Sequence, residues 1–344
     1  MRHANERETS RRTLLRTGAA VGTTAALGAA GAFAALPAGT ANASPLRAVD
    51  PRPGKLPYPA GVTDTSHASR KVADIFRGFY TAKSEHNAAK LMTYFSKTNA
   101  YYIDASSGGI WPSWDVLNSF FSGYFATNPP ADAISYPLRI VGDERSALVE
   151  FEDVPELFGK ELRILGSVTF DRHRKIIRWI DYWDGRSALI QNAITSSYPT
   201  DFRDTEQNAD PEVVGVARAL QAAYAAADAA GAVALFSFDA VHEDMAAHCR
   251  LRGQLQIQRY YTRALGALPY GPGAALVHVE GSRQGGGYEW TAAPLAAPMR
   301  RGHTCIELDE TGKISRLTAI YDSSLLSYAA YTSLVGLAAE APLS

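Results

Sequence analysis

The residues with the clearest chemical potential lie in one short segment, Trp179-Ile180-Asp181-Tyr182-Trp183. Side chains alternate along a strand, so Trp179, Asp181 and Trp183 would share one face. A carboxylate between two indoles is costly to bury without compensation, and burial raises its pKa. Asp181 is therefore a candidate general base or acid. The alternative is that both tryptophans belong to the core and Asp181 is a rim residue satisfied by backbone donors.

Other residues of the same half could complete an acid–base site. Two carboxylates in an apolar cavity repel each other, so the pKa of one of them rises. Asp181 would be the ionised base, and Tyr102 would orient water or a substrate oxygen. The proton donor would be one of Asp104, Glu152 and Asp153. Such a set suits hydrolysis, isomerisation or a lyase reaction, and none of these requires a cofactor.

Aromatic residues are concentrated around these positions. They would line a pocket for a hydrophobic or aromatic small molecule, although plain core filling is the alternative. The expected substrate-binding residues are Trp111, Trp114, Trp179, Trp183 and Tyr80.

The elements that must position these residues follow a simple order. Apolar residues at helical spacing predict a helix from about residue 70, broken near 84–87, and a second helix over 114–125. Strand patterns cover 99–104, 138–141, 147–154, 162–170 and 176–183. We therefore expect an α+β unit in which helices cover one side of a curved antiparallel sheet and leave a cone-shaped apolar pocket.

The same order of elements recurs in the second half of the chain. Lys313-Ile314-Ser315-Arg316 corresponds to Lys175-Ile176-Ile177-Arg178 at an offset of 138 residues, and Tyr224 is matched to Tyr80 at an offset of 144. A nearly constant offset through the same order of elements is typical of a tandem duplication. The chain is therefore predicted to contain two cone-shaped α+β domains.

The second copy lacks most of the acid–base set. Ala319 corresponds to Asp181, His242 to Tyr102 and Asp244 to Asp104. We expect this copy to be a structural partner, in an intramolecular pseudo-dimer or a homodimer. A metal cluster among its histidines is disfavoured, because their spacing matches no common ligand pattern. No cofactor or metal is expected, and a disulfide between Cys249 and Cys305 is left open.

The closing strand resembles that of the limonene epoxide hydrolase family. Leu162-Arg163-Ile164-Leu165-Gly166 and Trp179-Ile180-Asp181-Tyr182-Trp183-Asp184 carry the resemblance. That family belongs to the SnoaL-like and nuclear-transport-factor-2-like superfamily, which also includes ketosteroid isomerase. The resemblance implies that Asp181 is the base that activates water, and that Tyr102-Ile103-Asp104 holds that water where the family has Tyr-x-Asn.

One part of the family pattern is missing. The family carries Arg-x-Asp on a central strand, whereas this chain has Glu150-Phe151-Glu152-Asp153. Arg178, Arg163 or Arg139 could replace the missing cation, although nothing in the sequence shows it. The resemblance therefore supports a carboxylate site more strongly than epoxide hydrolysis.

The N-terminal segment is predicted to be an export signal. Ser10-Arg11-Arg12-Thr13-Leu14-Leu15-Arg16 resembles a twin-arginine motif, an uncharged Ala- and Gly-rich run follows, and Ala41-Asn42-Ala43 is a small-x-small cleavage site. The run is too diluted by Gly and Thr to favour a stable membrane span. The segment holds five of the 34 basic and two of the 35 acidic residues, so the remaining chain carries a net charge of −4. This charge argues against a nucleic-acid partner.

These observations define the predicted organisation of the chain. It comprises a signal peptide at 1–43, a Pro-rich lead-in at 44–69, domain 1 at 70–196, a linker at 197–210 and domain 2 at 211–344. The predicted function is that of an exported, cofactor-free acid–base enzyme acting on a hydrophobic small molecule. The alternative is a noncatalytic small-molecule-binding protein with the same fold.

Overall fold

The computed structural model describes residues 56–188 and 209–339, which belong to one compact unit. The predicted signal peptide, much of the lead-in and most of the linker lie outside the described residues. Among the helices of the described residues, none is long and apolar enough to cross a membrane.

Among the described residues, the first half has three helices in the regions where the sequence predicts helix and a fourth that it does not predict. They are α2 (Arg70–Ser84), the short α3 (Ala88–Leu91) and α4 (Trp114–Phe125), followed after the fifth strand by the one-turn α5 (Pro155–Phe158). Ser69, Asn87 and Ser113 cap the first three, because each side chain accepts a hydrogen bond from a backbone N–H of the first turn. The predicted break at 84–87 is the turn between α2 and α3, and a 3₁₀ turn, η2 (Met92–Tyr94), follows α3.

The first sheet has seven strands. Its spatial order is β1 (Asp64–Ala68), β4 (Ser135–Gly142), β5 (Ser146–Asp153), β6 (Leu162–Phe170), β7 (Ile176–Tyr182), β2 (Tyr101–Asp104) and β3 (Gly109–Trp111). The sheet is mostly antiparallel, but β1 pairs in parallel with β4, and β2 with β7. Two strands are not predicted by the sequence pattern: β1 falls in the expected lead-in, and β3 is only three residues long.

The second half repeats this plan. Its sheet has the order β10 (Ala275–Ser282), β11 (Gly285–Thr291), β12 (Arg301–Leu308), β13 (Ile314–Tyr321), β8 (Phe236–Asp244) and β9 (Cys249–Arg252). Its elements outside the sheet are α6 (Pro211–Ala225), α7 (Ala229–Val233), α8 (Gln254–Ala264), α9 (Tyr328–Ala338), and the 3₁₀ turns η3 (Pro294–Ala296) and η4 (Ser323–Leu325). The α+β class with two tandem units, each with helices packed on a sheet, is therefore confirmed.

The strand registers confirm the predicted correspondence between the copies. Asp104 pairs with Asp181 across β2 and β7, and Asp244 pairs with Ala319 across β8 and β13. The helix correspondence needs a correction. Asn87 and Asp228 cap equivalent helices, which sets the local offset at 141 residues rather than 144. Tyr80 therefore corresponds to Gln221, and Lys83 to Tyr224.

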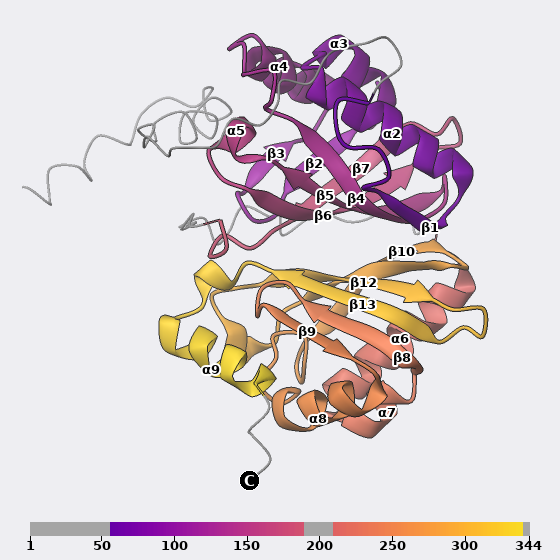
Figure 1. Cartoon of the computed structure of the whole chain (residues 1–344), viewed down its shortest axis with the longest axis vertical. Coiled ribbons are helices and arrows are strands. Elements are labelled where there is room, and N and C mark those ends of the chain that lie inside the picture. The colour runs from indigo at the N-terminus through magenta and orange to yellow at the C-terminus, as the bar shows by residue number, and fades with distance from the viewer. Residues whose placement is uncertain (1–55, 189–208, 340–344) are drawn as a thin grey trace, which may run out of the picture. The chain divides into compact units, whose positions relative to one another are not determined.

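Each sheet has one face covered by its own helices. In Figure 1, α2, α3 and α4 lie over one face of the first sheet, and α6, α7 and α8 over one face of the second. Each helix–sheet layer encloses its own apolar core, and a third cluster joins residues of both sheets, such as Ile103, Ile180 and Ile320. Cys305 belongs to this third cluster and Cys249 to the core of the second half, and both are free thiols.

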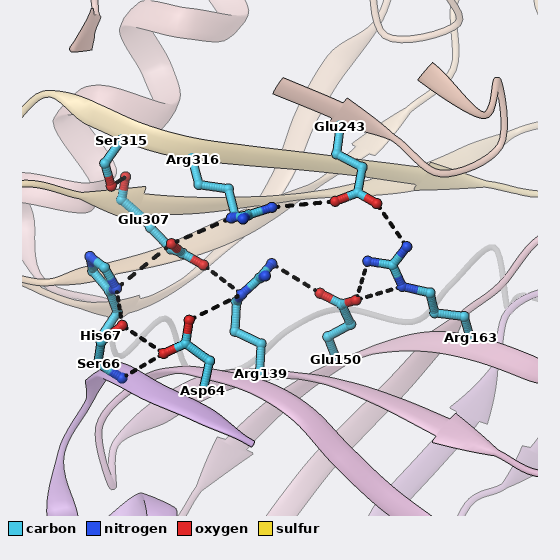
Figure 2. Close-up of polar contacts among 10 residues, drawn as sticks. All are labelled: Asp64, Ser66, His67, Arg139, Glu150, Arg163, Glu243, Glu307, Ser315 and Arg316. Atoms are coloured by element: carbon cyan, nitrogen blue, oxygen red, sulfur yellow. Dashed lines mark hydrogen bonds and ion pairs between the residues drawn. The ribbon is translucent and has the colours of Figure 1, made fainter. Parts of the chain in front are cut away.

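Charged residues on the sheet faces opposite the helices form a closed ring (Figure 2). Arginine and glutamate alternate around it, and each neighbouring pair has charged atoms within 3.8 Å of each other. Such alternation gives every buried charge two partners of opposite sign, which offsets the cost of desolvation. Three members come from each half, in the order Arg139, Glu150, Arg163, Glu243, Arg316 and Glu307.

The two halves also exchange equivalent hydrogen bonds. The Ser323 amide donates to Asp184 Oδ1 at 2.7 Å, and the Gly185 amide donates to Asp322 Oδ1 at 3.0 Å. Asp184 and Asp322 follow equivalent strands of the repeat, so the same contact is made twice in opposite directions. This reciprocity is the signature of an isologous interface formed within one chain.

The ring predicts an acid-sensitive contribution to stability. Burial alone would raise the pKa of Glu243, but Arg163, Arg250 and Arg316 outweigh it and hold that pKa below its usual range. A lowered carboxyl pKa contributes stability that is present above the unfolded pKa and is lost as pH falls through the folded one. Glu243→Gln should therefore lower the free energy of unfolding at pH 7 by roughly 1–3 kcal/mol, with a smaller difference below about pH 4.

Urea titrations at several pH values would measure this difference. Asp74→Asn is a matched control, because Asp74 pairs with Arg77 on the surface and both side chains are more than half exposed. The control should change stability by less than about 0.5 kcal/mol. A loss for Glu243→Gln that is no larger than that of the control at pH 7 would contradict the role given to the ring.

Candidate active site

Asp181 lies on β7, on the face covered by the helices, and only 3% of its surface is exposed. Both carboxylate oxygens have donors. The Trp179 indole N–H donates to Oδ1 at 2.6 Å, and the Tyr102 hydroxyl donates to Oδ2. Tyr102 reaches it because β2 runs parallel to β7 in register. The structure thus brings together Asp181, Tyr102 and Trp179, three of the predicted site residues.

Asp104 is the second carboxylate of this site. It pairs with Asp181 across β2 and β7, and the Trp183 indole N–H donates to its Oδ1 at 2.9 Å. The backbone amides of Ser106 and Ser107 donate to the same oxygen at 3.0 and 2.7 Å. Each predicted tryptophan of the closing segment therefore donates a hydrogen bond to one carboxylate: Trp179 to Asp181, and Trp183 to Asp104.

The two carboxyl groups differ in how strongly their ionised forms are supported. Burial, followed by the nearby Asp104, raises the pKa of Asp181 to about 8, although Tyr102, Trp179 and Lys83 oppose the rise. Burial also raises the pKa of Asp104, but hydrogen bonds from Ser107, Trp183 and Ser106 counteract it. Asp181 is therefore the group that holds a proton near neutral pH.

Gly166 leaves room for this arrangement. It is paired with Asp181 across β6 and β7. A Cβ atom at Gly166 would lie 3.0 Å from Asp181 Oδ1 and 3.0 Å from the Trp179 indole nitrogen. The equivalent residue of the second half is Thr304, which is paired with Ala319. In the first half, Gly166 is thus paired with the larger Asp181. In the second half, Thr304 is paired with the smaller Ala319.

Asp153 lies on the same face of the sheet, but its carboxylate forms an ion pair with a lysine. Lys83 of α2 donates to Asp153 Oδ1 at 2.7 Å, and both side chains are less than a tenth exposed. Lys83 is not among the residues predicted for the site. The available signal was its spacing, because Lys83 lies seven residues after Phe76 on the apolar stripe that also holds Phe79 and Tyr80.

None of the three arginines proposed to replace the missing cation lies on the face that holds Asp181. Arg139 and Arg163 belong to the ring, and Arg178 donates to Ser167 and Glu289 on the same side of the sheet. They point away from the helices because their side chains alternate with those that face Asp181. Lys83, by contrast, places its ammonium on the helix-covered face.

Glu152 is not brought to the site. Side chains alternate along β5, so Phe151 and Asp153 face the helices and Glu152 points to the opposite side. The Trp114 indole N–H donates to the backbone oxygen of Met92 at 3.1 Å, and its side chain packs on the apolar core of the first half.

Aromatic rings surround Asp181. Trp179 stacks on Phe79 with ring centroids 4.7 Å apart and on Tyr102 with centroids 5.9 Å apart. Trp111 contacts the edge of Tyr102, and Phe120 packs on Trp111 at 4.6 Å. Tyr102, Trp111 and Phe120 are only partly buried, and we call this partly exposed cluster the aromatic rim.

The comparisons with known proteins give structural neighbours only. No family model and no curated protein matches the sequence. The structure is similar to a steroid delta-isomerase from Pseudomonas aeruginosa, with 15% identity, a TM-score of 0.31, and coverage of 39% of this chain and 93% of that one. It is also similar to a putative SnoaL-like polyketide cyclase from Shewanella putrefaciens, with 11% identity, a TM-score of 0.30, and coverage of 35% and 83%. An NTF-2-like protein of unknown function from Burkholderia xenovorans shows 18% identity, a TM-score of 0.27, and coverage of 32% and 83%.

The equivalent region of the second half has different chemistry. His242 occupies the position of Tyr102, and its Nδ1 lies 3.1 Å from the Tyr261 hydroxyl. Burial lowers the pKa of His242 to about 3, so its imidazole is neutral. Asp244 accepts a hydrogen bond from Tyr270 at 3.1 Å. In the described parts of the chain, no group of three or more His, Cys, Asp or Glu residues could hold a metal ion.

The raised pKa of Asp181 predicts how stability depends on pH. The folded pKa of about 8 exceeds the unfolded value of about 3.9, so folding favours the protonated acid. This contribution is fully present below about pH 4 and is lost as pH rises through about 8. Relative to Asp181→Asn, which cannot ionise, the wild type should lose stability progressively between pH 4 and 8.

Urea midpoints of both proteins, measured from pH 4 to 9, would test this. The difference between the two curves is the relevant quantity, because every other ionisable group is common to both proteins. Curves that run parallel from pH 4 to 8 would show that Asp181 is not protonated in the fold.

Proposed function

We propose that the first half of the chain is a cofactor-free acid–base enzyme acting on a hydrophobic small molecule, with Asp181 as the group that exchanges a proton with the substrate. The observation that carries the proposal is the buried Asp181 carboxyl, which contacts a phenol and an indole and has a pKa of about 8. A proton-transfer group works best when its pKa lies near the working pH.

The pKa order assigns the roles. Asp181 holds a proton at neutral pH, so it first acts as the acid and becomes the base after giving that proton up. Asp104 is the second carboxyl of the pair, and three N–H donors favour its ionised form against the burial that raises its pKa. Tyr102 donates to Asp181 and would orient the oxygen that receives the proton.

This assignment favours some reactions over others. An Asp181 carboxyl that already holds a proton suits isomerisation or a lyase reaction, in which an oxygen or a carbon is protonated. Epoxide hydrolysis, which the resemblance to limonene epoxide hydrolases suggests, needs a base that is already ionised to activate water. The aromatic rim of Tyr102, Trp111 and Phe120 favours a flat, apolar substrate.

Asp181→Asn should lower turnover by roughly 10²- to 10⁴-fold, because the amide keeps the shape of the side chain but cannot transfer a proton. The substrate panel would contain β,γ-unsaturated ketones, epoxides and aromatic diols, followed by ultraviolet absorbance and mass spectrometry. The wild-type rate should also change across pH 8.

Glu152→Gln is the matched control, because it removes a carboxylate from the opposite face of the same sheet. It should retain wild-type turnover. Equal turnover by wild type and Asp181→Asn on every reactive substrate would overturn the proposal.

A noncatalytic binding protein is the second candidate. It is favoured by one observation, namely that both oxygens of Asp181 are already engaged by donors of the protein itself. Tight binding of one panel compound by both wild type and Asp181→Asn, with no turnover by either, would establish this function instead.

We also propose that the protein is exported by the twin-arginine route, as the segment Ser10–Arg16 and the site Ala41-Asn42-Ala43 suggest. Replacement of Arg11 and Arg12 by lysine should retain a full-length chain inside the cell. Cell fractionation with an antibody would measure this, and undiminished export of the double-lysine variant would contradict the proposal.

A further inference from the structure

The large apolar side chains that are exposed among the described residues all belong to the second half. They are Phe238, Leu255, Leu295 and Tyr328. Phe238 is 85% exposed and Leu255 is 60% exposed. Single exposed apolar residues are common on soluble proteins, so their meaning depends on what surrounds them.

The charge in the segment that holds Leu255 has a single sign. Residues 245–277 contain four arginines and no aspartate or glutamate, and all four arginines are exposed. The equivalent residues 105–138 of the first half contain two aspartates and no lysine or arginine. The two copies of one fold therefore carry opposite charge on equivalent elements, which points to an anionic partner for the second. The four arginines are Arg250, Arg252, Arg259 and Arg263.

One row of exposed residues runs along α8. Leu255, Arg259 and Arg263 are spaced four residues apart, so they lie on one side of the helix, and all three are exposed. The core-facing side of α8 carries Ile257, Tyr260, Tyr261 and Ala264. At the end of the row, the Arg263 guanidinium donates to the backbone oxygen of Leu337 in α9 at 3.2 Å.

The start of this row adjoins the ends of two strands. Arg252 is the last residue of β9, which lies beside α8 (Figure 1). A Cβ atom at Gly253 would lie 3.5 Å from the backbone oxygen of Phe238, so β8 passes the start of α8 at that residue. Asp239, next to Phe238, is an exposed acidic neighbour, and three arginines outweigh it. We call the following residues the arginine surface: Phe238, Arg252, Leu255, Arg259 and Arg263.

The first half shows that the fold does not require these residues. The helices α4 and α8 begin at equivalent positions, Trp114 and Gln254. In α4, the three positions of the row carry Asp115, Ser119 and Gly123.

The chemistry of the arginine surface fits an interface that is anionic outside and apolar beneath. Guanidinium groups form strong hydrogen bonds with phosphates, and exposed phenylalanine and leucine side chains enter the boundary between lipid headgroups and acyl chains. A stable complex with an acidic protein would instead require apolar residues that pack together at the centre of the interface. Phe238 and Leu255 alternate with charged residues along their elements, which favours the lipid.

We propose that the arginine surface docks the second half on membranes that contain anionic phospholipids. Arg252, Arg259 and Arg263 contact lipid phosphates, while Phe238 and Leu255 enter the headgroup region. The docking does not depend on the acid–base chemistry of the first half. It gives the second copy a role of its own, because a hydrophobic substrate is concentrated in the lipid phase.

Vesicle co-sedimentation tests the docking directly. The protein is the chain without its predicted signal peptide, which keeps every residue that the structure describes. We expect it to bind vesicles that contain phosphatidylglycerol at least about tenfold more tightly than vesicles of phosphatidylcholine alone, and the difference should shrink as salt is added. Equal binding to both vesicles, or binding to neither, would overturn the proposal.

A pair of charge variants tests the location. Arg252→Gln with Arg259→Gln should weaken binding to the anionic vesicles roughly 30-fold, because each arginine contributes about fivefold. Arg70→Gln with Arg172→Gln is the matched control, since it removes the same charge from exposed sites of the first half and should leave binding unchanged. Equal weakening by the two double variants would show that only net charge matters, which overturns the assignment to this surface.

A third double variant tests the apolar contribution. Phe238→Ser with Leu255→Ser should weaken vesicle binding roughly tenfold and leave binding to dextran sulfate, a soluble polyanion, unchanged. Vesicle binding that is insensitive to this variant would mean that the surface takes soluble polyanions rather than membranes. Urea midpoints establish that each variant folds. The lipid and salt dependence of the unmodified chain decides the matter for any variant that does not.

Discussion

Each sheet buries both of its faces, and this constraint shapes the rest of the molecule. One face packs under the sheet's own helices, and the other meets the sheet of the second copy through an apolar cluster and charged side chains. Charges placed there must be paired, which explains the closed ring that includes Arg139, Glu150 and Glu307. The charges of the ring lie on the shared face, whereas Asp181 and its donors lie on the helix-covered face of the first half.

The sequence predicted the parts of this arrangement that depend on local pattern. The alternation of Trp179, Asp181 and Trp183 follows from strand geometry, and the bounds of α4 and β6 agree with the apolar periodicity. The parallel alignment of β2 with β7 could not be derived, because pairing between distant strands is set by tertiary packing. That alignment brings Tyr102 to Asp181, so the sequence could name both residues but not their hydrogen bond.

Lys83 shows a different limit of sequence reasoning. A lysine on the apolar stripe of a helix is ordinarily placed at the edge, with its ammonium in water. Here the partner that allows burial, Asp153, lies 70 residues away on β5, and only the assembled fold shows that the two charges meet. The three arginines considered as substitutes failed for a simpler reason, since the alternation along their strands directs them to the other face of the sheet.

The reciprocal hydrogen bonds of Asp184 and Asp322 have an evolutionary consequence. In a symmetric pair of identical subunits, any substitution appears twice, so a change that suits one pocket is imposed on the other. Covalent fusion removes that coupling while it keeps the two-fold contact, and it holds the partners at a high effective concentration. One copy could then give up its carboxylate for Ala319 without cost to the other. A tandem chain therefore allows its two pockets to differ, as Asp181 and Ala319 do at equivalent positions.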